Sequence, residues 1–181
     1  MKYFKEVLIT EEKLKTRALE IGKLIDEKYG EEPIMIIGLL KGAYVFTSDV
    51  ARSVKNPNLE VEFMVAKSYS NGSSTGEVQI ILDLKKEVKN KNVILVEDIV
   101  DTGRTLSKVK DLMLFRGAKK VEIAVMCTKP SRREISVEID YPSFVIPNEI
   151  VVGYGLDYNE KFRHLPYVAS ITKETFEKFK I

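Results

Sequence analysis

Residues 93–106 of the chain read VILVEDIVDTGRTL. The stretch opens with four consecutive apolar residues, which is typical of a short strand buried on both faces of a parallel sheet. Acidic residues follow at Glu97, Asp98 and Asp101, and the segment Thr-Gly-Arg-Thr completes the stretch. The pattern predicts a buried strand whose carboxyl end carries acidic groups next to a turn suited to an anion.

The rest of the chain repeats this alternation of strand and helix patterns. Further apolar runs occur at 34–40 (IMIIGLL) and 120–128 (KVEIAVMCT), and both predict strands. Residues 11–29 carry apolar side chains at helical spacing, with Thr10 as N-cap and Gly30 as stop, and helices are also predicted after residue 41 and from about residue 105 to Gly117. We therefore expect an α/β domain with a central, mostly parallel sheet flanked by helices.

The C-terminal part of the chain has a different character. Residues 143–171 form short extended pieces that proline and glycine residues interrupt, which favours a small hood over another strand-helix-strand unit. Because the chain has only 181 residues, we expect a single domain over 1–181. In this interpretation the hood is built from about 1–10 and 140–181.

Composition narrows the classes of function. The formal net charge is +2 and basic pairs such as Arg132-Arg133 are scattered among acids, so we interpret these pairs as solvated surface and expect no nucleic-acid partner. The longest apolar run is far shorter than the roughly 20 residues that cross a bilayer, so we expect no membrane span. A charged N-terminus and one cysteine, Cys127 in an apolar run, favour a cytoplasmic protein with a buried thiol.

The opening stretch has the chemistry of a phosphate cradle beside acids. The carboxyl ends of parallel strands face the ligand crevice, so Glu97 and Asp98 should lie there. Amides of the following turn, the hydroxyls of Thr102 and Thr105 and the start of a helix can hold an anion, and Gly103 allows close backbone approach. The Gly-Lys-Ser/Thr end of a P-loop is missing. Helix capping alone would need one acid and not three, although it stays the simpler alternative.

The segment EDIVDTGRT resembles the phosphoribosyl-pyrophosphate (PRPP) signature of the type I phosphoribosyltransferases. Four further segments resemble the hypoxanthine-guanine phosphoribosyltransferase family, in that family's order: LLKGAYVF (39–46), KSYSNGSSTG (67–76), CTKP (127–130) and VVGYGLDYNEKFRHLP (151–166). The resemblance covers roughly residues 9–171. It implies the type I phosphoribosyltransferase fold and an enzyme of purine salvage that acts in a dimer or tetramer.

The reaction implied by the resemblance joins PRPP to a 6-oxopurine base with Mg²⁺ as cofactor. Hypoxanthine would give IMP, guanine would give GMP, and pyrophosphate would leave. Bond breaking puts positive character on the ribose, so catalysis is expected to be electrostatic. Asp101 would act at N7 of the purine as general base or hydrogen-bond acceptor. The 5′-phosphate would be held by Asp101, Thr102, Gly103, Arg104 and Thr105.

Further site residues follow from the same resemblance. Glu97 and Asp98 would meet the ribose hydroxyls and the metal, and Asp157 would contact the purine and a second Mg²⁺. Lys129 would donate to the purine O6, beside Ile150 and Val151. Some family members have an aromatic residue at the position of Ile150, so stacking on the base is lost here. The remaining residues are Lys41, Gly42 and Arg163 for pyrophosphate, with a cis bond between Leu40 and Lys41, and Ser68 and Tyr69 in a lid that reaches Thr75.

Other interpretations remain open for these residues. Lys129 and Arg163 are also consistent with surface charges, and the lid with a plain linker. A non-catalytic member of the fold would bind PRPP or nucleotide and regulate nucleic acid, but that class calls for a basic face. A xanthine- or orotate-directed transferase would share the phosphate loop without combining it with Lys129 and VVGYGLD. Preference among hypoxanthine, guanine and xanthine is not encoded in any of these motifs.

Overall fold

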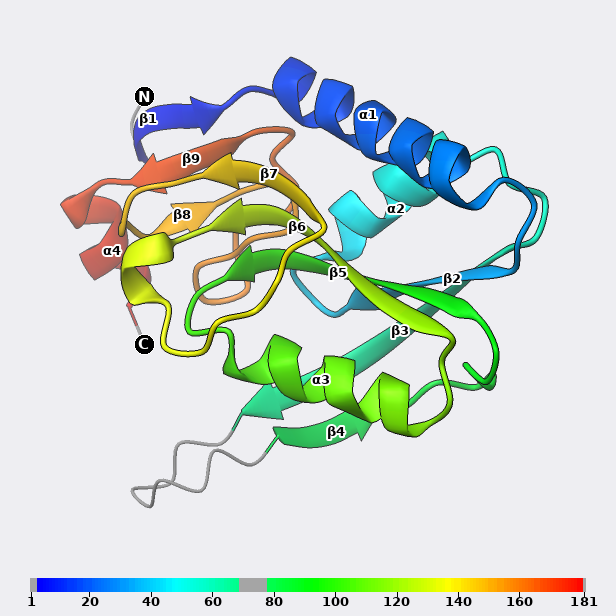
Figure 1. Ribbon diagram of the computed structural model, residues 1–181. Coiled ribbons are helices and arrows are strands. Elements are labelled where there is room, and N and C mark those ends of the chain that lie inside the picture. Colours follow the sequence, from blue (N-terminus) through cyan, green and yellow to red (C-terminus); the bar gives the residue numbers. More distant parts are fainter. Residues whose placement is uncertain (1–2, 69–77, 181) are drawn as a thin grey trace.

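A six-stranded sheet forms the centre of the molecule (Figure 1). The computed structural model describes residues 3–68 and 78–180. Neighbouring strands run parallel except for the outermost pair, β3 and β4, which is antiparallel, so the expected mostly parallel α/β sheet is confirmed. In spatial order the strands are β4 (Val78–Leu82), β3 (Leu59–Ser68), β2 (Ile34–Leu39), β5 (Asn92–Val100), β6 (Lys120–Thr128) and β7 (Tyr141–Val145).

Helices cover both faces of this sheet (Figure 1). All six residues of β2 are buried, and its side chains alternate between two cores. Ile34 and Ile36 join the core beneath α1 (Glu11–Tyr29) and α2 (Tyr44–Ser53), whereas Met35 and Ile37 join the core beneath α3 (Arg104–Phe115). This double burial is the reason why the apolar run at 34–40 predicted its strand correctly.

The predicted ends of the first helix are confirmed. The Thr10 side chain accepts a hydrogen bond from the Lys13 amide at 3.4 Å, which caps one of the unpaired amides at the start of α1. At the other end Gly30 adopts a φ of +54°, where a residue with a Cβ would be strained. Local backbone chemistry thus sets both ends of α1, independently of the packing of its buried face.

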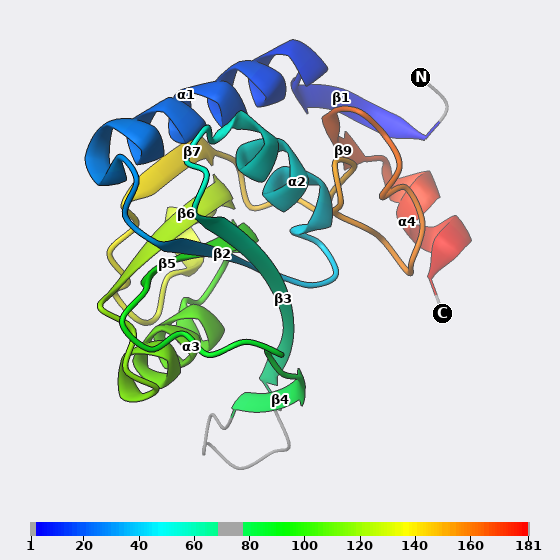
Figure 2. The same cartoon turned by 90° about the vertical axis from the view of Figure 1, so that its right-hand side faces the viewer.

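A second, three-stranded antiparallel sheet forms the hood. Its strands are β1 (Phe4–Ile9), β9 (Val168–Ile171) and β8 (Val151–Val152), followed by the short helix α4 (Lys173–Phe179). Figures 1 and 2 show these elements grouped on the side of the molecule toward which β5 and β6 point. The N- and C-terminal segments therefore meet beside the carboxyl ends of the central strands.

One boundary differs from the sequence-based expectation. We expected the hood to begin at about residue 140, but β7 pairs with β6 in the main sheet, with Tyr141 opposite Ala124. Pro142 argued against a strand in the main sheet, because proline has no amide hydrogen to donate to a neighbouring strand. The sheet accommodates it because β7 is an edge strand. The Pro142 carbonyl accepts a hydrogen bond from the Arg17 guanidinium at 2.6 Å, which ties this edge to α1.

Part of the predicted lid lies outside the described residues. Ser68 is the last residue of β3, and the expected segment from Tyr69 to Thr75 falls wholly in the range 69–77. Among the helices that the structure describes, none combines the length and the apolar character that a membrane crossing requires. The cytoplasmic location stays a prediction.

Candidate active site

Two of the three acids of the opening stretch, Glu97 and Asp98, lie within β5 and not after it. The predicted strand ended at Val96, but pairing with β6 continues through Val100, which lies opposite Thr128. Polar residues in the second half of the strand concealed this extension. Burial raises the pKa of Glu97 well above its ordinary value, and the neighbouring Asp98 carboxylate raises it further. Burial also raises the pKa of Asp98, so the pair is a place where a cation or a hydroxyl donor would be stabilising.

Gly42 lets the backbone come close to Asp98, and Gly155 lets a second backbone segment come close to Gly42. A Cβ on Gly42 would lie 1.4 Å from the Asp98 Oδ2 atom, and a Cβ on Gly155 would lie 2.0 Å from the Gly42 carbonyl oxygen. Neither position can hold a larger residue without movement of the backbone or of Asp98. The turn after β2, the acidic pair of β5 and the segment at 153–163 are therefore packed together.

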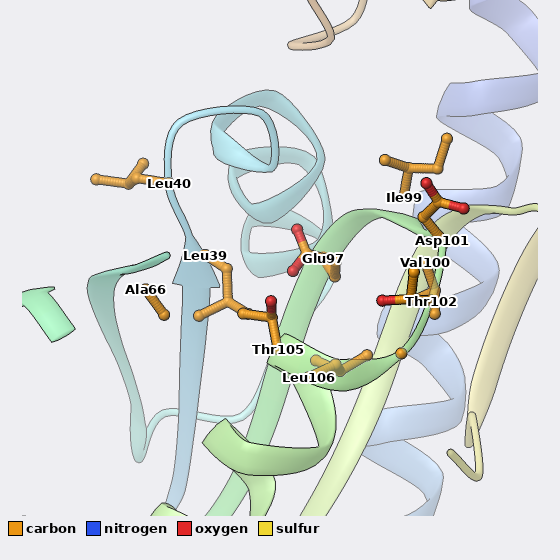
Figure 3. A pocket seen from close by; sticks show the side chains of 11 residues that line it. Leu39, Leu40, Ala66, Glu97, Ile99, Val100, Asp101, Thr102, Thr105 and Leu106 are labelled. Carbon is orange, nitrogen blue, oxygen red and sulfur yellow. The ribbon is translucent and has the colours of Figure 1, made fainter. Parts of the chain in front are cut away.

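A pocket of about 350 Å³ lies between the end of β2 and the loop after β5. Glu97, Asp101, Thr102, Gly103 and Thr105 line it together with apolar side chains of β2 and β5. Figure 3 shows the Glu97 carboxylate and the hydroxyls of Thr102 and Thr105 pointing toward the same space. Helix α3 begins there at Arg104, after Gly103 with a φ of +86°. The unpaired amides at the start of a helix make this a suitable place for a phosphate.

A segment that the sequence-based prediction left out braces the phosphate loop. The amides of Glu134 and Ile135 both donate to the Thr102 carbonyl, at 3.1 and 3.0 Å. Arg132 Nε lies 2.6 Å from Asp101 Oδ1, and Arg133 donates to the Asp101 carbonyl at 3.3 Å.

The interpretation of Arg132-Arg133 as solvated surface holds for Arg132, whose side chain is 49% exposed, whereas Arg133 is half-buried and hydrogen-bonded to the loop. Both residues contact the loop, because the chain turns back toward it after β6. The signal that could have revealed them is their position, three and four residues after the predicted site residue Lys129.

Lys129 stands at the end of β6, beside the residues predicted to meet the base. Its amide donates to the Val100 carbonyl at 3.2 Å, and its Nζ donates to the Glu149 carbonyl at 2.8 Å. Burial lowers the pKa of Lys129. Next to Glu149, the Ile150 side chain is 42% exposed whereas Val151 is buried. The structure thus brings Lys129, Ile150 and Val151 together, with an exposed aliphatic surface on one side.

The residues predicted to bind pyrophosphate form a separate charged cluster. Arg163 donates to the Gly155 carbonyl at 2.8 Å, and its Nη1 lies 2.9 Å from Asp157 Oδ1. Lys41 follows β2 across a cis peptide bond from Leu40, as expected, and its Nζ lies 3.1 Å from Glu160 Oε2. Glu160 was not predicted, because its position among other charged residues carries no signal of its own. The cluster joins the turn after β2 to the segment at 157–163.

The predicted metal ligands lie in different parts of this arrangement. Over residues 3–68 and 78–180, no three His, Cys, Asp or Glu side chains gather into a cluster that could hold a metal ion. Asp157 is engaged by Arg163 and by the Glu160 amide, which donates to its Oδ2 at 2.7 Å. The half-buried pair Glu97 and Asp98 still fits a cation, since a positive ion would relieve their mutual repulsion. Mg²⁺ commonly binds through one or two carboxylates and takes its other oxygens from substrate and water.

Known proteins with similar sequences cover nearly the whole chain. The family model for the phosphoribosyl transferase domain matches residues 10–159. The chain is 44% identical to a hypoxanthine phosphoribosyltransferase of Salmonella typhimurium over 174 residues, which is 94% of this chain and 97% of that protein. It is 42% identical, with the same coverage, to the hypoxanthine phosphoribosyltransferase of Escherichia coli.

Solved structures agree with this similarity. A crystal structure of a hypoxanthine phosphoribosyltransferase from Staphylococcus aureus matches with a TM-score of 0.91 and 41% identity, over 96% of this chain and 94% of that one. A hypoxanthine-guanine phosphoribosyltransferase from Bacillus anthracis, solved with a HEPES molecule in its active site, matches with a TM-score of 0.88 and 38% identity, over 93% and 99% of the two chains.

Proposed function

Because this chain belongs to the hypoxanthine phosphoribosyltransferases, with the type I phosphoribosyltransferase fold, we propose that it transfers the phosphoribosyl group of PRPP to hypoxanthine and guanine. The products would be IMP or GMP, together with pyrophosphate. The observation that carries this proposal is the pocket in which Glu97 lies opposite the hydroxyls of Thr102 and Thr105. The phosphate of a sugar phosphate requires hydrogen-bond donors such as the threonine hydroxyls, and its ribose hydroxyls require an acceptor such as the carboxylate.

The phosphate loop would bind the 5′-phosphate of PRPP. Amides of the turn from Asp101 to Thr105 and the two threonine hydroxyls supply donors, and the start of α3 supplies a favourable dipole. Glu97 and Asp98 would then meet the ribose hydroxyls, and the raised pKa of Glu97 favours contact with donors or a cation. Mg²⁺ bound near this pair would add positive charge that stabilises the departing pyrophosphate.

Asp101 is proposed to act on the incoming base. Its carboxylate would face N7 of the purine and accept a hydrogen bond or a proton while the new bond to the ribose forms at N9. In the structure the same carboxylate is paired with Arg132 Nε at 2.6 Å, and both side chains are partly exposed. An exposed ion pair of this kind contributes little, so a purine can replace it at low cost.

Lys129 is proposed to select 6-oxopurines. Its ammonium group now donates to the Glu149 carbonyl, and it would donate to the purine O6 beside Ile150 and Val151. Adenine carries an amino group at that position, which would put a donor against a donor. Unpaired buried polar groups cost about 1–3 kcal/mol, so adenine should be rejected strongly.

Pyrophosphate would be held on the other side of the acidic pair. Lys41 and Arg163 supply charge there, the Gly42 backbone approaches Asp98 closely, and Asp157 keeps Arg163 in place. A forked guanidinium suits paired phosphate oxygens. The lid predicted around Ser68 and Tyr69 would close over this arrangement during turnover and exclude water from the ribose.

We propose in addition that the chain assembles into a dimer or tetramer, as the family resemblance implied. Apolar side chains on the outer strands are exposed: Val61 by 42%, Ile81 by 52% and Leu82 by 45%. Exposed apolar side chains on strands at a sheet edge are candidates for contact with another copy of the chain. Sedimentation of the purified protein as a monomer at micromolar concentration would rule this assembly out.

The activity is tested by steady-state assays with PRPP, Mg²⁺ and each base in turn. Hypoxanthine and guanine should give IMP and GMP with release of pyrophosphate, and adenine should give no product. Orotate and xanthine serve as competitors that test the two alternative base specificities. If PRPP binds but no base is converted, the chain is a binding protein and not a transferase.

A further inference from the structure

The carboxylate of Glu160 lies between the two cations of the pyrophosphate cluster. Its Oε2 atom is 3.1 Å from Lys41 Nζ and 3.3 Å from Arg163 Nη2. This one oxygen accepts a hydrogen bond from Lys41 and forms an ion pair with Arg163, the two side chains that the proposed function assigns to pyrophosphate. Arg163 is tied further to Asp157, but Lys41 has no other ion pair within the described residues.

The backbone around Glu160 holds the carboxylate in this place. Tyr158 and Lys161 form an isolated antiparallel bridge, with each amide donating to the other residue's carbonyl at 3.2 Å. The two residues between them, Asn159 and Glu160, have φ values of +51° and +62°. Positive φ at both central positions is the geometry of a type I′ turn, which asparagine and glycine tolerate well.

Glutamate at the second position of such a turn is unusual. A residue with a long side chain is disfavoured at positive φ, and such positions persist where the surrounding structure holds them. Here the Glu160 amide donates to Asp157 Oδ2 at 2.7 Å, and the Asn159 side chain donates to the Phe179 carbonyl of α4. The turn is thus anchored on both sides, and its strained residue is the one whose carboxylate reaches the two cations.

We propose that the Glu160 carboxylate competes with the substrate's anionic group for Lys41 and Arg163, and that pyrophosphate or the pyrophosphate moiety of PRPP displaces it from these two side chains. The inference rests on the proposed function for these two cations. Without a ligand, Glu160 keeps the two positive groups close together and partly neutralised. With a ligand, both ion pairs must break, so Glu160 lowers the affinity for the anion and speeds its release.

Solvent exposure limits the size of this effect. The side chains of Lys41 and Glu160 are 66% and 65% exposed, whereas Arg163 is 19% exposed. Exposed ion pairs are weak, because water and salt screen them. Loss of the Glu160 carboxylate should therefore strengthen pyrophosphate binding by about two- to tenfold, and not by orders of magnitude.

The test compares Glu160→Gln with Glu177→Gln. Both variants lose one negative charge, but Glu177 lies exposed on α4 and makes no ion pair with any described residue. Isothermal titration with pyrophosphate in the presence of Mg²⁺ should show about two- to tenfold tighter binding to Glu160→Gln, with Glu177→Gln like the wild type. The KM for PRPP should fall in the same proportion, and the KM for hypoxanthine should stay unchanged.

A gain in affinity separates this role from a structural one, since damage to the turn would weaken binding. Glu160→Gly provides a second variant, because glycine relieves the positive φ and removes the carboxylate. Affinity for pyrophosphate equal to or weaker than that of the wild type in both variants would overturn the inference alone. A wild-type protein that binds neither pyrophosphate nor PRPP would overturn the proposed function as well.

Discussion

Asp101 has two proposed roles, one for its backbone in the phosphate loop and one for its carboxylate at the purine. Its backbone begins the phosphate loop, where Arg133 donates to its carbonyl, and its carboxylate is paired with Arg132. A base that acts on the purine has to leave that ion pair without moving the loop. The Asp101 carboxylate can leave Arg132 while the loop stays in place, because the loop is held by hydrogen bonds to its backbone carbonyls.

Replacing Asp101 should therefore separate catalysis from binding. Asp101→Asn keeps the shape and the backbone contacts but removes the basic carboxylate, so kcat should fall by about 10²- to 10⁴-fold. The Kd for PRPP, measured by fluorescence or calorimetry, should change little. A parallel loss of PRPP affinity would instead place Asp101 in the phosphate site alone.

Lys129→Ala should weaken binding of the base and leave binding of PRPP intact. Removal of the donor to O6 is expected to raise the KM for hypoxanthine by an amount equivalent to about 1–3 kcal/mol, while the Kd for PRPP is retained. Lys129→Arg is the matched variant, because it keeps the charge and changes the donor geometry. Unaltered hypoxanthine kinetics in Lys129→Ala would exclude this lysine from base recognition.

At the scale of elements, β6 leads from a buried ion-pair cluster around Glu122, near its start, to the proposed base-binding residue Lys129, which follows its last residue. Glu122, near its start, is fully buried and joins three elements: its carboxylate accepts from Lys120 at 2.6 Å, from Tyr141 of β7 at 2.7 Å and from Lys28 of α1. Burial alone would raise the pKa of Glu122, but the hydrogen bonds from Lys120, Lys28 and Tyr141 outweigh it and lower the pKa from 4.5 to about 2.

The sign of this shift sets a pH dependence of stability. A carboxyl group whose pKa is lower in the folded state stabilises the fold above its ordinary value of 4.5, and that contribution is lost as pH falls toward about 2. At pH 7 the free energy of unfolding of Glu122→Gln should be about 1–3 kcal/mol lower than that of the wild type, as measured by urea denaturation. Below pH 4.5 the variant should lose less stability than the wild type as the pH falls. Equal acid slopes in the two proteins would contradict this role.

Helix α4 supports the turn that carries Glu160. The Tyr158 and Phe176 rings stack with centroids 5.3 Å apart, and Phe162 packs edge-on against Phe179 at 5.4 Å. Phe179→Ala should weaken this support by about 0.5–1.5 kcal/mol and raise the KM for PRPP more than the KM for hypoxanthine. Lys173→Ala, at the other end of α4, is the control. An equal rise in both KM values would show a general loss of structure.

The elements that sequence patterns predicted well are those whose signals are local. The caps of α1 and the apolar runs of β2 and β6 depend on neighbouring residues, and each was located correctly. β7 was missed because a short strand with a proline resembles a loop until its partner is known. The pairing of Arg132 with Asp101, and of Glu160 with Lys41, depends on contacts between segments distant in the sequence.

For the whole molecule, the two apolar cores hold the fold without any metal cluster among the described residues. Because the proposed reaction uses Mg²⁺, its removal by EDTA should abolish turnover, and we expect the Tm of the substrate-free protein to stay unchanged. With PRPP present, Mg²⁺ should raise the Tm, because a ligand that binds only the folded state stabilises it. A drop in Tm on chelation without substrate would indicate a structural metal.

The β7 edge of the main sheet is protected against unwanted association. In a strand, the amide and carbonyl of one residue point to the same side, and at Pro142 the amide is missing while the carbonyl is taken by Arg17. A strand from another molecule would find neither a donor nor a free acceptor there. The proline that obscured β7 in the sequence thus removes one of the positions at which another strand could form hydrogen bonds with this edge of the folded sheet.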